Sequence, residues 1–147
     1  MIKAVIFDFN RTLYDPDSKG IEKETRGMLY CLKDSRIKLG LISVNSRKML
    51  IDDLGLPIIF SFILFTDEKT KEDFENAMEQ LKASKEETIV VGDEIKSEIK
   101  AANKAGIRTV WLRKGKFADE FPDSIEEEPD YVIEEISDII QIINSID

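Results

Sequence analysis

Apolar residues in this chain fall into short, nearly continuous runs that are separated by longer, mixed segments. Six runs have the unbroken apolar character expected of strands buried on both faces of a sheet. They are IKAVIFD (2–8), IKLGLIS (37–43), PIIFSFILF (57–65), TIVVGD (88–93), IRTVWL (107–112) and YVI (131–133). Between the runs, apolar residues recur every three or four positions, which predicts amphipathic helices.

The helical spacing is clearest in the second half of the chain. Three apolar faces stand out: Phe74, Ala77, Met78 and Leu81; Ile95, Ile99 and Ala102; and Ile136, Ile139, Ile140 and Ile143. Gly55 and Gly106 occupy positions where helix C-terminal caps are expected. Strands that alternate with helices predict an α/β fold, a three-layer Rossmann-like sandwich with a mostly parallel central sheet and helices on both faces. We expect residues 1–147 to form a single domain.

Composition narrows the possible chemistry. The chain has 147 residues, a net charge of −9 and no histidine. The lack of histidine excludes Ser-His-Asp catalysis and imidazole metal sites, and the acidic balance argues against a nucleic-acid partner. No apolar run approaches the ~20 residues of a membrane span, the N-terminus lacks a signal-peptide pattern, and the single Cys31, expected in the core, cannot close an internal disulfide. These features predict a cytoplasmic protein without membrane contact.

Polar side chains end three of the predicted strands: Asp8, Ser43 and Asp93. We expect them to converge, because ligands of parallel α/β sheets bind beyond the carboxyl ends of the strands. Two carboxylates without histidine or cysteine favour Mg²⁺. A hydroxyl at the start of a helix near Asn45, together with a lysine from the next helix, would complete a phosphoryl-transfer site.

Four short motifs, in order along nearly the whole chain, resemble those of the haloacid dehalogenase (HAD) superfamily. FDFNRTL matches its DxDGT motif, GLISVNS its strand ending in Ser or Thr, EKTKEDFENAMEQL its lysine before a helix, and VVGDEIKSEIKAANKAGI its strand ending in GD with a further acid. By position, the matching residues are Asp8, Asn10 and Thr12, Ser43, Lys69 with Lys71 as the alternative, and Asp93 with Glu98. The sequence leaves two roles open for Glu98: it supports the site, or it lies exposed on a helix.

The resemblance implies a magnesium-dependent phosphohydrolase that acts through an aspartyl phosphate on Asp8. It implies that Asp8, the backbone carbonyl of Asn10, and Asp93 hold Mg²⁺, and that Ser43 and Lys69 bind the phosphoryl oxygens. We count Arg11, Thr12 and Asn45 as candidate substrate-binding residues.

The first motif departs from the superfamily pattern at two positions. Asn10 replaces the aspartate that serves there as general acid and base, and an amide cannot exchange a proton at neutral pH. Such a loss typically costs ~10²–10⁴ in rate. We therefore expect a slow enzyme that favours leaving groups needing little protonation, such as aryl or acyl phosphates. The alternative is a protein with the same fold that has lost catalysis and either binds phosphate and magnesium or has a regulatory role. Arg11 stands where a glycine is usual, and either contacts an anionic substrate or points outward.

The spacing between the motifs leaves no room for a cap domain. About 34 residues separate Asp8 from Ser43, and about 25 separate Ser43 from Lys69. The resemblance implies that such capless members act on large phosphorylated substrates or borrow cover from another subunit, which would make the protein a homo-oligomer.

Two other α/β classes fit the sequence less well. A response-regulator receiver needs an acidic pair after its first strand and its phosphoacceptor after its third, and PIIFSFILFTDE does not end in that way. A dinucleotide-binding Rossmann domain needs a glycine-rich turn after the first strand, which FDFNRTL lacks.

Overall fold

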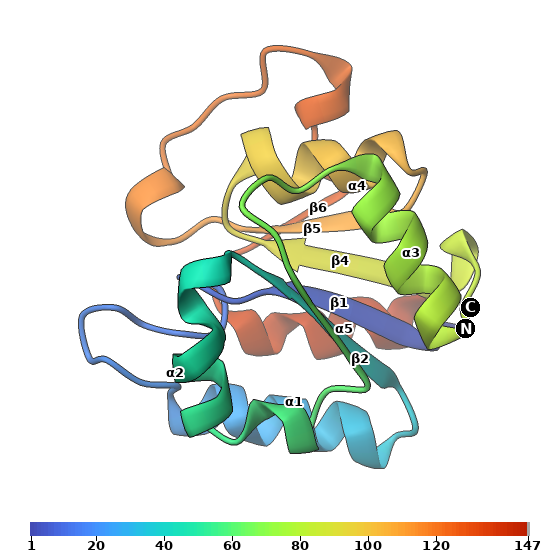
Figure 1. The fold of residues 1–147 in the computed structure, drawn as a ribbon. Helices are drawn as coiled ribbons and strands as arrows, with labels where there is room; N and C mark the ends of the chain where they lie inside the picture. Colours follow the sequence, from blue (N-terminus) through green and yellow to red (C-terminus); the bar gives the residue numbers. More distant parts are fainter. Residues whose placement is uncertain (147) are drawn as a thin grey trace.

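The computed structural model describes residues 1–146 and contains a six-stranded sheet in which every neighbouring pair of strands is parallel. The strands are β1 (Ala4–Asp8), β2 (Lys38–Ser43), β3 (Phe62–Phe65), β4 (Thr88–Gly92), β5 (Arg108–Leu112) and β6 (Tyr131–Ile133). Their order in the sheet is β3-β2-β1-β4-β5-β6 (Figure 1). This arrangement confirms the predicted α/β class.

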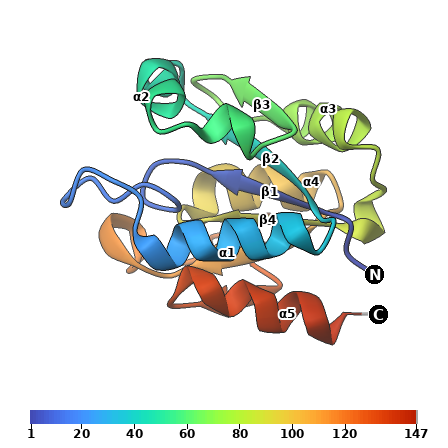
Figure 2. The same ribbon diagram turned by 90° about the horizontal axis from the view of Figure 1, so that it is seen from below.

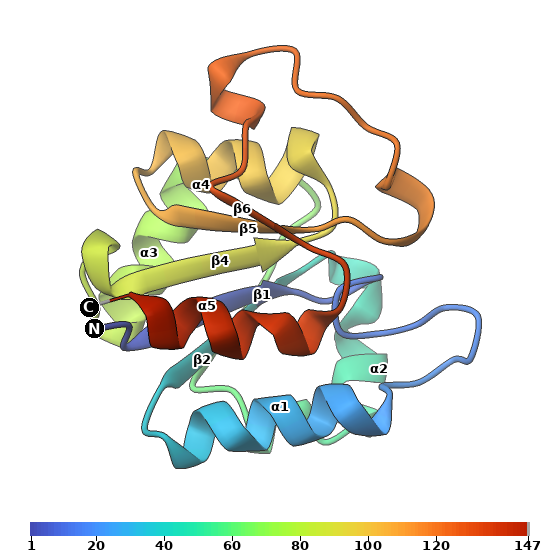
Figure 3. The ribbon, with the colours of Figure 1, turned by 180° about the vertical axis from the view of Figure 1, so that it is seen from behind.

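Helices cover both faces of the sheet. They are α1 (Lys23–Asp34), α2 (Lys48–Asp53), α3 (Lys71–Leu81), α4 (Lys100–Lys104) and α5 (Ile139–Ser145), with short 3₁₀ or π turns η1 (Asn45–Arg47), η2 (Leu56–Ile58), η3 (Lys85–Glu87), η4 (Ile95–Ile99), η5 (Gly115–Phe117), η6 (Ile125–Glu127) and η7 (Ile136–Asp138). Helices α1 and α5 lie on one face, and α3 and α4 lie on the other (Figures 2 and 3). Across residues 1–146, every helix is too short or too polar to cross a membrane.

The central strand β1 shows why its residues are all apolar up to Asp8. Val5 and Phe7 face the core cluster under α1 and α5, whereas Ala4 and Ile6 face the cluster under α3 and α4. All four are fully buried. Because side chains alternate between the faces of a strand, both faces must be apolar when helices cover both.

The helix boundaries follow from local sequence. Thr70 caps α3 in a capping box with Asp73, in which each side chain accepts a hydrogen bond from the other residue's backbone N–H. Such a cap typically stabilises by ~1 kcal/mol. Gly55 and Gly106 adopt left-handed φ angles of 74° and 76° after α2 and α4, which confirms both as helix ends.

Two expectations from the sequence were wrong. The predicted strand at 57–65 is a strand only from Phe62 onward, since Leu56–Ile58 forms a 3₁₀ turn. Pro57, which has no N–H for a strand ladder, favours that turn. Cys31 is exposed on α1 and does not lie in the core, because the buried face of this helix is formed by Thr25, Met28, Leu29 and Leu32.

Candidate active site

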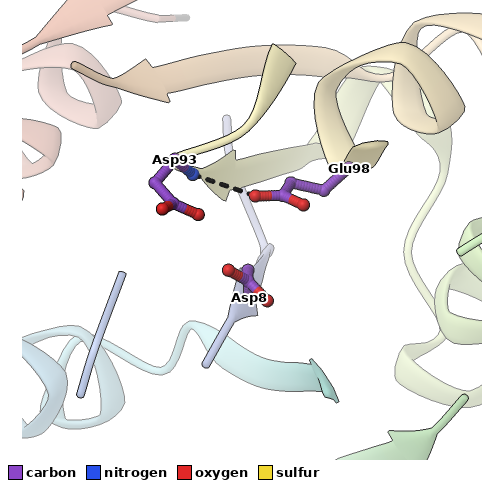
Figure 4. A group of neighbouring side chains, drawn as sticks. All are labelled: Asp8, Asp93 and Glu98. Atoms are coloured by element: carbon purple, nitrogen blue, oxygen red, sulfur yellow. Dashed lines mark hydrogen bonds between the residues drawn. The ribbon is translucent and has the colours of Figure 1, made fainter. Parts of the chain in front are cut away.

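Three acidic side chains meet where β1 and β4 end. Asp8 is the last residue of β1, Asp93 directly follows β4, and Glu98 comes from η4 (Figure 4). One carboxylate oxygen from each lies within 4.8 Å of the others, and all three residues are buried. Ser43, buried at the end of β2, lies on the other side of β1. The parallel sheet therefore brings all three predicted strand-end residues to one edge.

Glu98 is held inside the site by the backbone. Its Oε1 accepts hydrogen bonds from the N–H groups of Asp93, at 2.9 Å, and Glu94, at 3.0 Å. The carboxylate lies directly over Gly92, where a Cβ atom would come within 2.0 Å of Glu98 Cγ. Residues 95–99 form a π turn, a local widening of the helix that often marks functional sites. These contacts resolve the open question about Glu98, which is not an exposed helix residue.

Lys69 places its ammonium between two of the carboxylates. Its Nζ donates to Asp8 Oδ1 and lies 3.4 Å from Glu98 Oε2. The loop that carries it is tied to β2, since the Thr66 N–H donates to the Ser43 carbonyl at 2.8 Å, and the Thr70 cap fixes its other end. Lys71 is exposed on the first turn of α3. Of the two candidate lysines, Lys69 is the one that lies in the site.

The acidic cluster fits a divalent cation. Among the described residues, Asp93 Oδ2 is the buried side-chain atom that has no hydrogen-bond partner. Both oxygens of Glu98 are already occupied, by two amides and by Lys69. Three carboxylates and one ammonium leave an excess of negative charge when all are ionised. Asp93 Oδ2 is thus the unpaired oxygen donor suited to a Mg²⁺ ion, and Asp8, whose oxygens accept from Lys69 and Thr12, would be the second carboxylate ligand.

Burial and repulsion within the cluster change its ionisation. Burial, together with the charge of Glu98, raises the pKa of Asp8 to about 6 and that of Asp93 to about 10. Burial also opposes ionisation of Lys69, but Glu98 and Asp8 outweigh it and raise the pKa of this lysine. Burial likewise opposes ionisation of Glu98, yet Lys69 and backbone N–H groups lower its pKa. At neutral pH the cluster without metal therefore retains a proton that a bound metal would displace.

The melting temperature in EDTA is expected to fall as the pH rises from about 5 to about 8. The folded-state pKa values of Asp8 and Asp93 lie above their ordinary value of 3.8. The folded state therefore holds extra protons, and the stability they provide is lost as the pH rises through the raised values. Mg²⁺ needs both carboxylates ionised, so the rise in melting temperature that it causes should grow over the same range. Scanning calorimetry in EDTA and in Mg²⁺ measures both trends.

The Asp93→Asn variant is the control for this pH dependence. It removes the group with the largest upward shift, so the difference between the Mg²⁺ and EDTA melting temperatures should become small and nearly independent of pH. An equal Mg²⁺ effect on the wild-type protein at every pH would contradict the coupling between metal and protons.

The residues after Asp8 form a tight turn beside the site. Thr12 is buried, and its hydroxyl donates to Asp8 Oδ2 at 3.2 Å, so it holds the carboxylate. Arg11 has a left-handed φ of 63°, which explains why a glycine is usual there. Its guanidinium carbon lies 5.8 Å from the centre of the Phe117 ring. Asn45 is exposed at the start of η1, and its backbone N–H donates to Asp67 at 3.2 Å.

Arg11→Gly should be more stable than Arg11→Ala by about 1 kcal/mol, because only glycine adopts a left-handed φ without the cost of a Cβ atom. Both variants lose the contact with Phe117, so their difference isolates the backbone term. Urea denaturation of the pair provides the measurement. Equal stabilities would show that the turn relaxes to an ordinary φ.

Three residues around the site did not emerge as functional from the sequence. Gly92 provides space for Glu98, and Trp111 donates its indole N–H to the Asp93 carbonyl at 2.9 Å. Arg47 donates to Asn10 Oδ1 at 3.2 Å. The Gly-Asp pair at the end of the strand could have indicated a role for Gly92. Trp111 lies opposite Gly92 in the β4–β5 register, which is known only once the strands are paired. Nothing in the spacing indicates the Arg47 contact.

Comparisons of the sequence and of the structure with known proteins agree with each other. Residues 18–112 match a family model described as haloacid dehalogenase-like hydrolase. Glyceraldehyde 3-phosphate phosphatase of Methanopyrus kandleri is 28% identical over 124 residues, which cover 78% of this chain and 53% of that protein. Pyrophosphatase PpaX of Oceanobacillus iheyensis is 32% identical over 124 residues, covering 76% and 55%. The crystal structure of a HAD phosphatase from Thermococcus onnurineus has a TM-score of 0.80 at 16% identity, covering 97% of this chain and 98% of that one.

The chain spans about half the length of these two curated relatives. The family match covers β2 to β5 with the helices between them, whereas Asp8 precedes the matched residues. The match extends over more than half of the chain, and the solved phosphatase structure has the same fold. The chain belongs to the haloacid dehalogenase-like hydrolase family.

Proposed function

We propose that this protein is a magnesium-dependent phosphohydrolase that acts through an aspartyl phosphate on Asp8. The observation that carries the proposal is the cluster itself: Lys69 lies between Asp8 and Glu98, beside a buried Asp93 oxygen that has no partner. Burying three carboxylates with only one ammonium group lowers the stability of the folded protein, so stability does not explain why the cluster is there. Costly charge clusters at the end of a parallel sheet are typical of functional sites.

In the first step an Asp8 oxygen attacks phosphorus. A new P–O bond forms, the bond to the leaving group breaks, and its electron pair departs with the leaving oxygen. Thr12 holds the second oxygen of Asp8, and Lys69 compensates charge on the transferring group. Ser43 and Asn45 bind the phosphoryl oxygens in this scheme. Asp8, the Asn10 carbonyl and Asp93 would hold Mg²⁺, which supplies further positive charge for the phosphoryl oxygens.

In the second step water attacks the aspartyl phosphate. The P–O bond to Asp8 breaks, the carboxylate is regenerated with its electron pair, and the proton of water passes to the departing phosphate. Asn10 offers no base for this step, so turnover is expected to be slow, with a rate lowered by ~10²–10⁴ relative to an enzyme with a general base.

The substrate class follows from the site and the family. We infer a phosphorylated compound, in keeping with relatives named glyceraldehyde 3-phosphate phosphatase and pyrophosphatase. Between Asp8 and Ser43 the chain forms a turn and α1, and between Ser43 and Lys69 it forms α2, η2 and β3. These elements belong to the core, so we propose that residues 1–147 act without a cap domain of their own.

Single-turnover labelling tests this proposal. Protein mixed with ³²P-labelled acetyl phosphate and Mg²⁺ should acquire label that is stable to denaturation and sensitive to hydroxylamine, as an acyl phosphate is. Asp8→Asn should lose this label and about 10³-fold or more of any p-nitrophenyl phosphatase activity. Asp52→Asn, an exposed aspartate on α2, is the matched control and should behave like the wild type. A folded wild-type protein that neither labels nor hydrolyses would overturn the proposal.

The alternative is a family member that holds magnesium and phosphate without turnover. The substitution at Asn10 favours it, whereas the intact cluster around Lys69 argues for chemistry. The same labelling separates the two, because a pure binding protein binds Mg²⁺ with Asp93 but never becomes labelled on Asp8.

A further inference from the structure

Asn10 makes an unexpected contact with Arg47. Arg47 belongs to η1, the turn that follows β2, and its Nη2 donates to Asn10 Oδ1 at 3.2 Å. Its guanidinium carbon also lies 5.5 Å from the centre of the Tyr14 ring. The arginine is thus held between an aromatic face and the side chain that replaces the superfamily's proton donor.

The surface beneath Arg47 is made of two stacked, buried aromatic rings. Tyr14 stacks on Phe9, with 5.2 Å between ring centres and an angle of 18° between the rings, and both residues are buried. The turn between them is closed by backbone hydrogen bonds from Tyr14 N–H to the Phe9 carbonyl, at 3.0 Å, and from Arg11 N–H to the Tyr14 carbonyl, at 2.8 Å. An arginine stacked on such a platform loses little further freedom when it donates a hydrogen bond.

The contact fixes which way the Asn10 amide faces. A guanidinium has five donors and no acceptor, so the amide must present its oxygen to Arg47. The Nδ2 hydrogens then face away from the arginine. Asn10 is consequently a hydrogen-bond donor toward its other side, and turning its oxygen there would break the hydrogen bond from Arg47.

We infer that Arg47 is a positioning residue that aims the Asn10 Nδ2 donor at the leaving-group oxygen. This inference rests on the proposed function. When the P–O bond breaks, the electron pair stays on the leaving oxygen, and the amide stabilises that charge by a hydrogen bond without transferring a proton. The leaving group departs as an anion, so the site accepts phosphoryl donors such as acyl and aryl phosphates. Protonation comes from solvent after departure.

The leaving-group dependence of kcat/KM tests the inference, because this parameter includes the departure of the leaving group and excludes hydrolysis of the aspartyl phosphate. A series runs from acetyl phosphate through p-nitrophenyl phosphate to phenyl phosphate, which has the poorest leaving group. Arg47→Met should lower kcat/KM for phenyl phosphate by about 10- to 100-fold, less than the ~10²–10³ typical of removing such a donor outright, because the Asn10 amide remains but is no longer oriented. The loss for acetyl phosphate should be threefold or less, since a carboxylate needs little help.

Two further variants separate positioning from other roles. Asn10→Ala should reproduce the steeper leaving-group dependence, and Asn10→Ala/Arg47→Met should be no worse than Asn10→Ala alone, because Arg47 acts through Asn10. Arg47→Lys keeps a cationic donor for Asn10 Oδ1 but loses the planar stacking on Tyr14, so its activity on phenyl phosphate should lie between that of Arg47→Met and that of the wild type. Melting temperatures confirm that each variant is folded.

The outcomes are distinct from those that test the proposed function. If the wild-type protein forms no aspartyl phosphate, the proposed function fails first. If the aspartyl phosphate does form, two results would show that Arg47 does not act through the amide and that the inference is wrong. One is an equal loss of kcat/KM for all three substrates in Arg47→Met. The other is a double variant in which the full losses of Arg47→Met and Asn10→Ala add together. Unchanged kinetics in Arg47→Met would overturn it as well.

Discussion

Lys69→Met should lower the free energy of unfolding by about 3–5 kcal/mol at about pH 8 without metal, the usual cost of removing one partner from a buried ion pair. The Lys69 side chain is only 7% exposed, and its ammonium contacts both Asp8 and Glu98. Without it, the ionised carboxylates of Asp8 and Glu98 repel each other with no cation between them. Phosphoryl transfer should also fall by about 10²-fold or more, because the charge on the transferring group loses its compensation. Urea denaturation and the labelling assay measure the two effects.

Lys71→Met is the matched control, since it removes the same group two residues away from an exposed position. It should change the free energy of unfolding by less than about 0.5 kcal/mol. The loss in Lys69→Met should also shrink toward about pH 5, where Asp8, with its pKa raised to about 6, takes up a proton. Equal effects of the two substitutions would contradict the assignment of Lys69 to the site.

Gly92→Ala should destabilise the protein by about 2–4 kcal/mol and weaken Mg²⁺ binding, through overpacking and the loss of buried hydrogen bonds. The added Cβ atom would lie 2.0 Å from Glu98 Cγ and 2.5 Å from Oε1, so the carboxylate must leave its place. Its bonds to the N–H groups of Asp93 and Glu94 and its contact with Lys69 then break. Chemical denaturation and Mg²⁺ titration by calorimetry provide the measurements.

Gly27→Ala serves as the control for this substitution. Gly27 lies inside α1, and an added Cβ atom would meet nothing within 4 Å. Alanine there should stabilise the protein by about 0.5–1 kcal/mol, because glycine is a poor residue in a helix interior. If Gly92→Ala proves as harmless as Gly27→Ala, Glu98 is not fixed in the way described.

The arrangement of the site could be predicted from the sequence because it depends on topology. Residues that end neighbouring parallel strands must meet at one edge, so Asp8, Ser43 and Asp93 could be placed together from strand patterns alone. The sheet order sets β1 between the two other strands, and the apolar runs that mark these strands are long enough to be unambiguous. The choice of Lys69 over Lys71 followed from its distance to Phe74 and from the Lys-Thr pair that it begins.

What escaped prediction depends on side-chain direction and local backbone geometry. Glu98 turns into the site because residues 95–99 form a π turn, which an i, i+3, i+4 pattern does not distinguish from an α-helix. Arg47 reaches Asn10 across 37 positions of sequence, and no spacing rule encodes such a contact. The left-handed φ of Arg11 could not be predicted, because the usual sign of such an angle in a sequence is a glycine.

A crystal structure of the protein soaked in Mn²⁺, which replaces Mg²⁺ and scatters anomalously, would show whether Asp8 and Asp93 together hold a divalent cation. One anomalous peak is expected at about 2.0–2.3 Å from carboxylate oxygens of both Asp8 and Asp93, the coordination distance of such hard cations. The peak should be absent in Asp93→Asn. A peak elsewhere, or none at saturating Mn²⁺ while the two carboxylates remain together, would show that Asp8 and Asp93 are not the ligands of a divalent cation.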